Sequence, residues 1–180
     1  MKYGYARCST TEDKQDIDRQ IRDLKAAGAE EVVFEYEHGD ASAILDLYDR
    51  RIVAFAIGDR NDNPLVFKTF DKAVKANPGA HPIFHSDRGF QYTNRTFHHK
   101  LKKAGMTQSM SRVAKCIDNG PMEGFWGILK RERYYGKRFT SKKALIQMIT
   151  DYISYYNNRR VQRKLGILTP FEKHVLFLAA

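Results

Sequence analysis

Two carboxylates stand out because of the local patterns around them. Asp87 follows a short apolar segment, residues 83–85, in a loop that contains Gly89, and Glu123 lies in the first turn of a helix that begins near Pro121. Thirty-five residues separate the two carboxylates. Carboxylates at a strand end and on a helix face can converge on magnesium, which usually takes one or two of them. Two such ions about 4 Å apart promote in-line phosphoryl displacement.

The spacing also has a plainer interpretation. An acidic residue at a helix N-terminus is common, because the helix dipole favours it there. From the spacing alone, metal chemistry and simple helix stabilisation therefore both remain open.

The charge distribution favours a polyanionic partner, most simply nucleic acid. The chain has 31 Lys and Arg against 21 Asp and Glu, a formal net charge of +10. Residues 1–42 carry a net charge of −4, and the remainder carries +14, mostly between residues 112 and 164. A basic block of this size is typical of nucleic-acid binding. A solvated basic surface is the alternative.

Length and composition exclude several classes of protein. The 180 residues suffice for one domain, or one domain and a fragment. The longest apolar run has six residues, and a membrane span needs about 20. Two cysteines, Cys8 and Cys116, form no disulfide framework. We therefore expect a cytoplasmic protein with no membrane contact.

Strands alternate with helices along the chain. Short β-rich runs and helical periodicity predict the elements, and Gly, Pro and capping residues mark their ends. The first 36 residues read as a β-α-β unit. The class is α/β or α+β with a mixed sheet. Strands are expected at 3–8, 32–36, 43–48, 51–57, 83–85 and 106–110, and helices at 17–27, 63–77, 93–104, 121–134, 141–156 and from 169 onward.

Four strings in the second part of the sequence carry a family resemblance: AILDLYDRRIVAFAI, HSDRGFQYTN, SMSRVAKCIDNGPMEGFWGILKRE and YYNNRRVQRKLGILTPFEK. With them, residues 43–180 resemble the catalytic core of insertion-sequence transposases with a retroviral-integrase-type domain. The resemblance implies an α/β, ribonuclease-H-like mixed sheet with flanking helices, which cuts and joins DNA. It also implies an Asp, Asp, Glu triad that holds Mg²⁺ or Mn²⁺. Asp87 matches the second Asp and Glu123 the Glu.

The same resemblance suggests residues that contact DNA. Lys130 lies seven residues after Glu123, on the same helical face, where the resemblance implies contact with a DNA end. Other basic residues are candidate phosphate contacts or solvated surface charges. They are Arg131, Arg133, Arg159, Arg160, Arg163 and Lys164.

The first Asp of the triad is missing from this sequence. In the family it lies on a strand just upstream of the AILDLYDRR string, and here the resemblance begins only near Ala43. Asp46 and Asp49 belong to the next strand and do not inherit its role. We therefore expect impaired catalysis, and the status of the chain as an enzyme stays open.

A different family pattern occupies the start of the chain. MKYGYARCSTTEDKQDIDRQIRDLKAAGAEEVVFEYEHG resembles the amino-terminal end of serine recombinases of the resolvase and invertase type. Ser9 matches their nucleophile and Arg7 an arginine beside it, whereas Cys8 stands where an aliphatic residue is expected. The downstream arginines of that family are absent, so the helix cap is the preferred interpretation of Ser9 and the nucleophile is the alternative.

The chain therefore reads as a chimera of two truncated mobile-element genes. We expect a resolvase-like, β-α-β fragment at 1–42, a truncated integrase core at 43–165, and a tail with a short helix at 166–180. A foreign strand at 32–37 could occupy the place of the lost first strand. We therefore hypothesise that Glu35 or Glu37 approaches Asp87 and Glu123 and supplies a third carboxylate.

Four interpretations of function remain. DNA transposition or integration by metal-dependent phosphoryl transfer, impaired by the missing Asp, is the main one. A non-catalytic DNA-binding remnant, a serine recombinase acting through Ser9, and a relic that does not fold stably are the alternatives. Each of the first three has DNA as its partner, which places the protein on the bacterial nucleoid, and a homo-oligomer is possible.

Overall fold

The computed structural model describes residues 3–8, 26, 31–36, 41–112, 120–137 and 139–179. The chain divides into two compact units, Met1–Asp40 and Ala41–Ala180. In the first unit, β1 (Tyr3–Cys8) and β2 (Glu31–Tyr36) pair in parallel, as a β-α-β unit requires. Both strands confirm the sequence prediction, whereas the helix predicted between them falls outside the described residues apart from Ala26.

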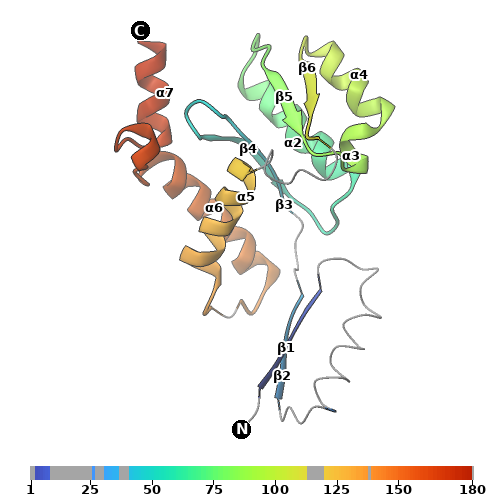
Figure 1. The fold of residues 1–180 in the computed structure, drawn as a ribbon, viewed down its shortest axis with the longest axis vertical. Coiled ribbons are helices and arrows are strands. Elements are labelled where there is room, and N and C mark those ends of the chain that lie inside the picture. The colour runs from blue at the N-terminus through green and yellow to red at the C-terminus, as the bar shows by residue number, and fades with distance from the viewer. Residues whose placement is uncertain are drawn as a thin grey trace. The chain divides into compact units, whose positions relative to one another are not determined.

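The strands of the second unit form two separate ladders (Figure 1). β3 (Ala41–Leu45) and β4 (Ile52–Ile57) form the predicted antiparallel hairpin. β5 (Ile83–Ser86) and β6 (Thr107–Met110) pair in parallel. Among the described residues, the predicted mixed sheet is therefore present as two-stranded pieces rather than as one continuous ladder.

The helices follow the predicted order, with two local differences. Asn94 accepts a hydrogen bond from the Phe97 N–H and caps the helix predicted over 93–104, which therefore begins at Arg95, after a separate short helix over Phe90–Thr93 that was not predicted. The helix predicted over 121–134 is α-helical only to Leu129 and continues as a π-helical turn. The helices are α2 (Asn63–Ala76), α3 (Phe90–Thr93), α4 (Arg95–Lys103), α5 (Gly120–Leu129), the π-helix η2 (Lys130–Tyr134), α6 (Lys142–Asn158), the 3₁₀ turn η3 (Arg163–Leu165) and α7 (Pro170–Leu178).

Two apolar clusters hold these elements. In one, the fully buried Phe97 ring of α4 meets Phe70 of α2 and Phe84 of β5 edge-on, both at 5.4 Å between centroids. In the other, Phe125 and Leu129 of α5 pack with Tyr152 of α6 and the hairpin. The hairpin thus lies against helices, and a two-stranded ribbon needs such support to persist in water.

One amide side chain fastens α6 to the hairpin. Asn157 accepts a hydrogen bond from the Ile52 N–H at 2.9 Å and donates one to the Ile52 carbonyl at 3.0 Å. An amide offers a donor and an acceptor side by side, as a neighbouring strand does. Asn157 therefore takes the place of a strand partner where β4 begins.

A second polar contact joins η2 to α6. The Glu132 carboxylate accepts bonds from the Arg160 guanidinium, at 2.7 Å to Nη2, and from the Tyr152 hydroxyl at 2.8 Å. The Arg160 hydrogen bonds hold the pKa of Glu132 below its usual value. Burial, together with the Glu132 carboxylate, raises the pKa of the Tyr152 hydroxyl. The π-helical turn is thus tied to the middle and the end of α6.

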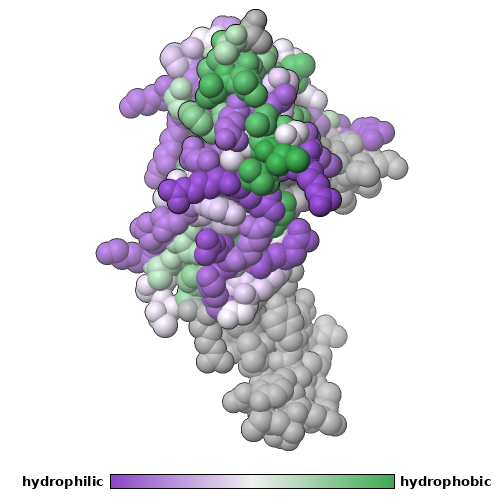
Figure 2. Space-filling view, turned by 90° about the vertical axis from the view of Figure 1, so that its left-hand side faces the viewer, coloured by the Kyte–Doolittle hydropathy of each residue, from purple (hydrophilic) through white to green (hydrophobic). Residues whose placement is uncertain are grey.

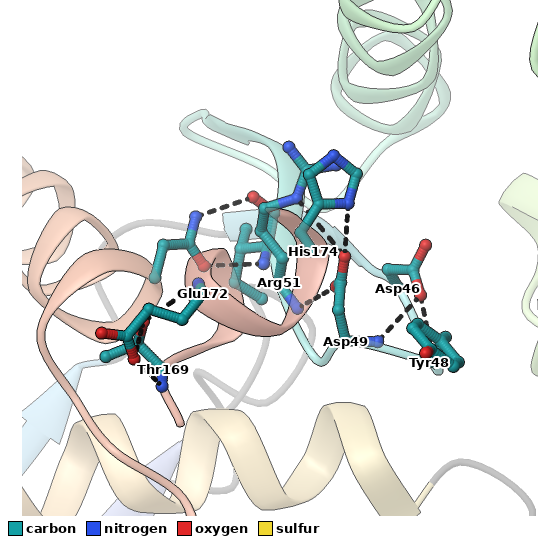
Figure 3. Close-up of polar contacts among 9 residues, drawn as sticks. Asp46, Tyr48, Asp49, Arg51, Thr169, Glu172 and His174 are labelled. Atoms are coloured by element: carbon teal, nitrogen blue, oxygen red, sulfur yellow. Dashed lines mark hydrogen bonds and ion pairs between the residues drawn. The ribbon is translucent and has the colours of Figure 1, made fainter. Parts of the chain in front are cut away.

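The turn of the hairpin is bound to α7 (Figure 3). Asp49 is 1% exposed, and its Oδ2 lies 2.9 Å from Nδ1 of His174. Beside this pair, the Tyr48 and Phe177 rings are 5.1 Å apart. Thr169 and Glu172 form a reciprocal capping box at the start of α7.

Figure 2 shows apolar side chains gathered at the C-terminal end of the chain, and the exposed ones on α7 are Phe171, Val175, Leu176, Phe177 and Leu178.

We expect Asn157→Ala to lower the free energy of unfolding by about 2 kcal/mol or more, because it leaves two backbone groups of Ile52 without their partner. Urea denaturation measures this loss. Asn158→Ala is the matched control, since Asn158 is exposed and donates only within α6, to Ser154. It should cost less than about 0.5 kcal/mol. Equal losses in the two variants would contradict the role given to Asn157.

The Glu132 contact predicts a dependence of stability on pH. A carboxylate whose pKa is lowered by folding stabilises the protein above its ordinary pKa, and this contribution is lost as the pH falls through the folded value. We therefore expect Glu132→Gln to destabilise the protein at pH 7 and to have a smaller effect at pH 3. Denaturant titrations at the two pH values test this. In an Arg160→Gln background the effect at pH 7 should shrink, and an unchanged effect would refute the coupling.

Candidate active site

Asp87 stands in an exposed loop directly after β5. Its Oδ1 accepts a hydrogen bond from the Gly89 N–H at 2.8 Å, and its carbonyl accepts one from the Ser86 hydroxyl at 2.9 Å. Within the described part of the chain, no hydrogen bond involves Oδ2. The loop thus orients the carboxylate through one oxygen and leaves the other for a ligand.

Gly89 lies close to two side chains, although its backbone angle does not require glycine. Its φ is −55°, which any residue adopts. A Cβ at this position would lie 2.9 Å from Oδ1 of Asp87 and 2.9 Å from Oε1 of Gln91. Real Cβ atoms essentially never approach so closely, so a larger residue requires both the Asp87 carboxylate and the Gln91 amide to shift.

Ser111, just after β6, holds both neighbours of Asp87. Its N–H donates to the Ser86 carbonyl at 2.9 Å, and its own carbonyl accepts from Nε of Arg88 at 2.9 Å. His85, on β5, lies 3.0 Å through Nδ1 from the Ser109 hydroxyl and 3.3 Å through Nε2 from that of Ser111. Ser111 therefore holds the backbone of Ser86 before the candidate metal ligand and the side chain of Arg88 after it.

The pKa of the Tyr92 hydroxyl is affected by the nearby Asp87. Burial first, and the negative charge of Asp87 second, raise the pKa of Tyr92 to about 12. The ring packs edge-on against Phe97, 5.4 Å between centroids. A neutral phenol therefore stands near the carboxylate at physiological pH.

Glu123 lies in the first turn of α5 and is exposed. Residues 113–119, which lead from β6 to α5, fall outside the described residues. Among those that are described, no group of three or more His, Cys, Asp or Glu side chains could hold a metal ion. The convergence of Asp87 and Glu123 on one cation therefore stays a prediction.

The residues predicted to contact DNA lie on η2 and around the end of α6. Arg131 and Arg133 are exposed, and the Arg133 guanidinium lies 5.9 Å from the centre of the Tyr155 ring. Lys130 is half-buried at the first π-helical residue. Arg160 is bound to Glu132. Exposed positions beyond α6 are held by Arg159, Arg163 and Lys164.

The predicted residues of the first unit are tested only in part. In the β1–β2 register, Arg7 lies opposite Glu35. Ser9 and Glu37 fall outside the described residues, as do the side chains of Arg7 and Glu35. The roles proposed for Ser9 and for a third carboxylate stay predictions.

Sequence reasoning missed the residues that position Asp87. Gly89 and Ser111 both stood inside quoted strings, HSDRGFQYTN and SMSRVAKCIDNG, and nothing in their type marked them. Within the strings, a glycine two residues after a candidate ligand was the one available signal, because small residues allow close approach.

Comparison with known protein families gives three matches. Residues 36–116 and 123–175 each match a model described as an integrase core domain. Residues 2–58 match the resolvase N-terminal domain. The first and third matches overlap over 36–58, so they do not locate the predicted boundary at residue 42.

Curated relatives are insertion-sequence proteins. The putative transposase InsK for insertion sequence element IS150 of Escherichia coli (strain K12) is 40% identical over 132 residues, 73% of this chain and 47% of that protein. An uncharacterized transposase-like protein of Haemophilus influenzae (strain ATCC 51907 / DSM 11121 / KW20 / Rd) is 41% identical over 129 residues, 72% of this chain and 60% of that protein. The chain thus spans about half the length of these relatives.

Solved structures confirm the ribonuclease-H-like fold class. The catalytic core domain of HTLV-2 integrase in complex with magnesium (trimeric form) matches with a TM-score of 0.57 at 15% identity, over 76% of this chain and 93% of that one. A chain of the simian T-cell lymphotropic virus intasome in complex with PP2A regulatory subunit B56 gamma matches with a TM-score of 0.60 at 16% identity, over 76% and 52%. No helix among the described residues is long and apolar enough to cross a membrane.

Both predicted resemblances, to the integrase core and to the resolvase amino-terminal segment, are therefore confirmed. The integrase-core matches account for the elements from β3 to α7, and the resolvase match accounts for β1 and β2. The chain contains the integrase core domain, which it shares with the insertion-sequence transposases that it resembles, and it carries a resolvase-type segment at its amino terminus.

Proposed function

We propose that this chain takes part in DNA transposition by metal-dependent phosphoryl transfer, with Asp87 and Glu123 as metal ligands. The observation that carries the proposal is the Asp87 carboxylate, oriented by the Gly89 N–H at the end of β5 and exposed on its other oxygen. It lies in a segment 40% identical to a transposase.

The donor set fits a hard divalent cation. Mg²⁺ and Mn²⁺ prefer carboxylate oxygens, and magnesium commonly keeps several waters beside one or two carboxylates. Asp87 and Glu123 are both exposed and supply such oxygens. A bound cation would neutralise charge on the scissile phosphate and activate a water or 3′-hydroxyl.

The basic residues of η2 and the end of α6 supply the DNA contacts in this proposal. Arg131, Arg133 and Arg159 are exposed and suit phosphate oxygens, while Lys130 would meet a DNA end. Arg160 serves first to hold Glu132, so it contributes to DNA binding through the surface it stabilises. Such a protein works on the bacterial nucleoid, as a homo-oligomer that brings two DNA ends together.

A non-catalytic DNA-binding protein is the second candidate. It is favoured by the missing first Asp and by the lack of a three-ligand cluster among the described residues. A binder of this kind would hold DNA without metal, and its affinity would fall steeply with salt. Cleavage through Ser9 is distinguished by a covalent protein–DNA adduct that forms without metal.

We expect plasmid nicking in Mn²⁺ or Mg²⁺ that EDTA abolishes, and a fall of about 100-fold or more in Asp87→Asn and in Glu123→Gln. Asp151→Asn is the matched control, an exposed acid on α6 whose side chain accepts from Gln147. It should nick like the parent chain. Salt-sensitive DNA binding without nicking would favour the non-catalytic candidate. Nicking in EDTA with a covalent adduct would favour Ser9.

The packing around Gly89 gives a separate test. Gly89→Ala should weaken Mn²⁺ binding, followed by electron paramagnetic resonance, and reduce nicking as Asp87→Asn does, because the new Cβ displaces the carboxylate. Gly127→Ala is the control, since its Cβ meets nothing within 4 Å. It should stabilise α5 by about 0.5–1 kcal/mol and leave Mn²⁺ binding unchanged. Normal Mn²⁺ binding in Gly89→Ala would contradict the role given to Gly89, whereas Asp87→Asn tests the ligand itself.

A further inference from the structure

The amide side chain of Gln91 lies beside the candidate metal ligand and has no part in the function proposed above. Gln91 is the second residue of α3, four residues after Asp87, and it is 6% exposed. Buried polar side chains ordinarily find hydrogen-bond partners for their donor and acceptor atoms within the protein. In Gln91 the donor has such partners among the described residues and the acceptor has none.

Both N–H bonds of the Gln91 amide are directed at Asn61. Nε2 donates at 3.0 Å to the Asn61 carbonyl and at 3.0 Å to Oδ1 of the Asn61 side chain. A side-chain amide nitrogen carries two N–H bonds, so these two acceptors account for both of them. The Asn61 carbonyl can only accept, and it therefore determines which end of the Gln91 amide faces Asn61. Oε1 must point the other way.

Oε1 of Gln91 lies close to the Asp87 carboxylate. A Cβ built on Gly89 would lie 2.9 Å from Oε1 of Gln91 and 2.9 Å from Oδ1 of Asp87. The two oxygens are therefore less than about 6 Å apart, a distance that a hydrated cation with ligand oxygens at about 2.1 Å and hydrogen bonds of about 2.8 Å can bridge. Because residue 89 is glycine, no side chain fills the space between them.

The chemistry of Oε1 restricts what it can bind. It can only accept a hydrogen bond, because both N–H bonds of the amide are directed at Asn61. The oxygens of a DNA phosphate diester also only accept, so Gln91 offers them no hydrogen bond. The partners that remain are hydroxyl groups and water. Among these, a water on a cation is the stronger donor, because hydrogen bonds assisted by charge are shorter and stronger than neutral ones.

We propose that Gln91 is a positioning residue of the Asp87 site, and that its Oε1 accepts a hydrogen bond from a water on the divalent cation. The inference rests on the proposed function, since it takes Asp87 as a ligand of that cation. Magnesium usually keeps several waters beside its carboxylate ligands. Gln91 orients one of these waters, and Asn61 holds the amide in the orientation that this requires.

Gln91→Met tests the amide at nearly constant side-chain length, because methionine has neither the N–H bonds nor the oxygen. Gln108→Met is the matched control. Gln108 donates from Nε2 to the Tyr92 carbonyl at 2.8 Å, and its Oε1 lies 3.2 Å from Nδ1 of His98. This amide is engaged at both ends, so its loss affects local packing without removing a free acceptor.

Gln91→Glu separates the oxygen of Gln91 from its N–H bonds. Like Gln91→Met it loses both hydrogen bonds to Asn61, but it keeps an acceptor oxygen and adds a negative charge. If Gln91 only fastened α3 to Asn61, the two variants would behave alike. Urea denaturation of each variant measures the stability that is lost with the Asn61 contacts, separately from metal binding.

Mn²⁺ binding to each full chain, without DNA, is measured by electron paramagnetic resonance. We expect Gln91→Met to weaken Mn²⁺ binding about tenfold, because partners that orient the groups around a metal commonly contribute 10- to 100-fold to its affinity. Gln108→Met should bind like the parent chain, and Gln91→Glu at least as tightly as the parent. Water-proton relaxation of the Mn²⁺-loaded proteins should show faster exchange of bound water in Gln91→Met but not in Gln108→Met.

Equal Mn²⁺ binding by Gln91→Met and the parent chain would overturn the inference. Equal weakening in Gln91→Met and Gln91→Glu would also overturn it, because only the first variant lacks the oxygen. Asp87→Asn separates this failure from that of the proposed function. Mn²⁺ binding that is lost in Asp87→Asn and retained in Gln91→Met overturns the inference alone. A parent chain that binds no Mn²⁺, or binding that Asp87→Asn leaves unchanged, overturns both.

Discussion

A two-stranded ribbon has no stability of its own in water, and the second unit is built around one. The β3–β4 hairpin persists because α6 supplies what a third strand would, with Asn157 satisfying both backbone groups of Ile52. Phe125 and Tyr152 bury the apolar side beside it. At the far end of the hairpin, the buried Asp49 is satisfied by His174 of α7. Helices that follow the ribbon by a hundred residues therefore determine whether it forms.

The same structure explains how a strongly basic chain tolerates its charge. Several acidic side chains bind groups within the chain. Glu132 binds Arg160 and Tyr152, Asp71 binds Lys100, and Asp49 binds His174. Each such pair fastens one element to another. Among the described residues, exposed cations such as Arg131, Arg133 and Arg159 face solvent, where they repel one another only weakly through water and salt. Because these acids bind groups of the same chain, the exposed cations form surfaces that suit a polyanion.

The Asp87 carboxylate, a metal ligand in the proposed function, is oriented by contacts within the chain. Ser111 accepts a hydrogen bond from the Arg88 side chain and donates one to the Ser86 carbonyl, which holds the loop. The Gly89 N–H donates to the carboxylate itself. Pre-orientation of this kind reduces the cost of ordering a ligand when it binds. These contacts lie within the chain, so they orient the carboxylate before any ligand binds.

The sequence alone determined most of the local structure and the family. Alternation and helical periodicity placed the hairpin, α2, α6 and the parallel β1–β2 pair close to their observed bounds, because these depend on neighbouring residues. The strings around Asp87 and Glu123 identified the integrase core. What the tertiary structure decided are contacts such as Asn157 with Ile52, 105 residues apart, and His174 with Asp49, 125 apart. Local patterns carry no information on which distant polar groups meet, since that follows from how whole helices pack against the ribbon.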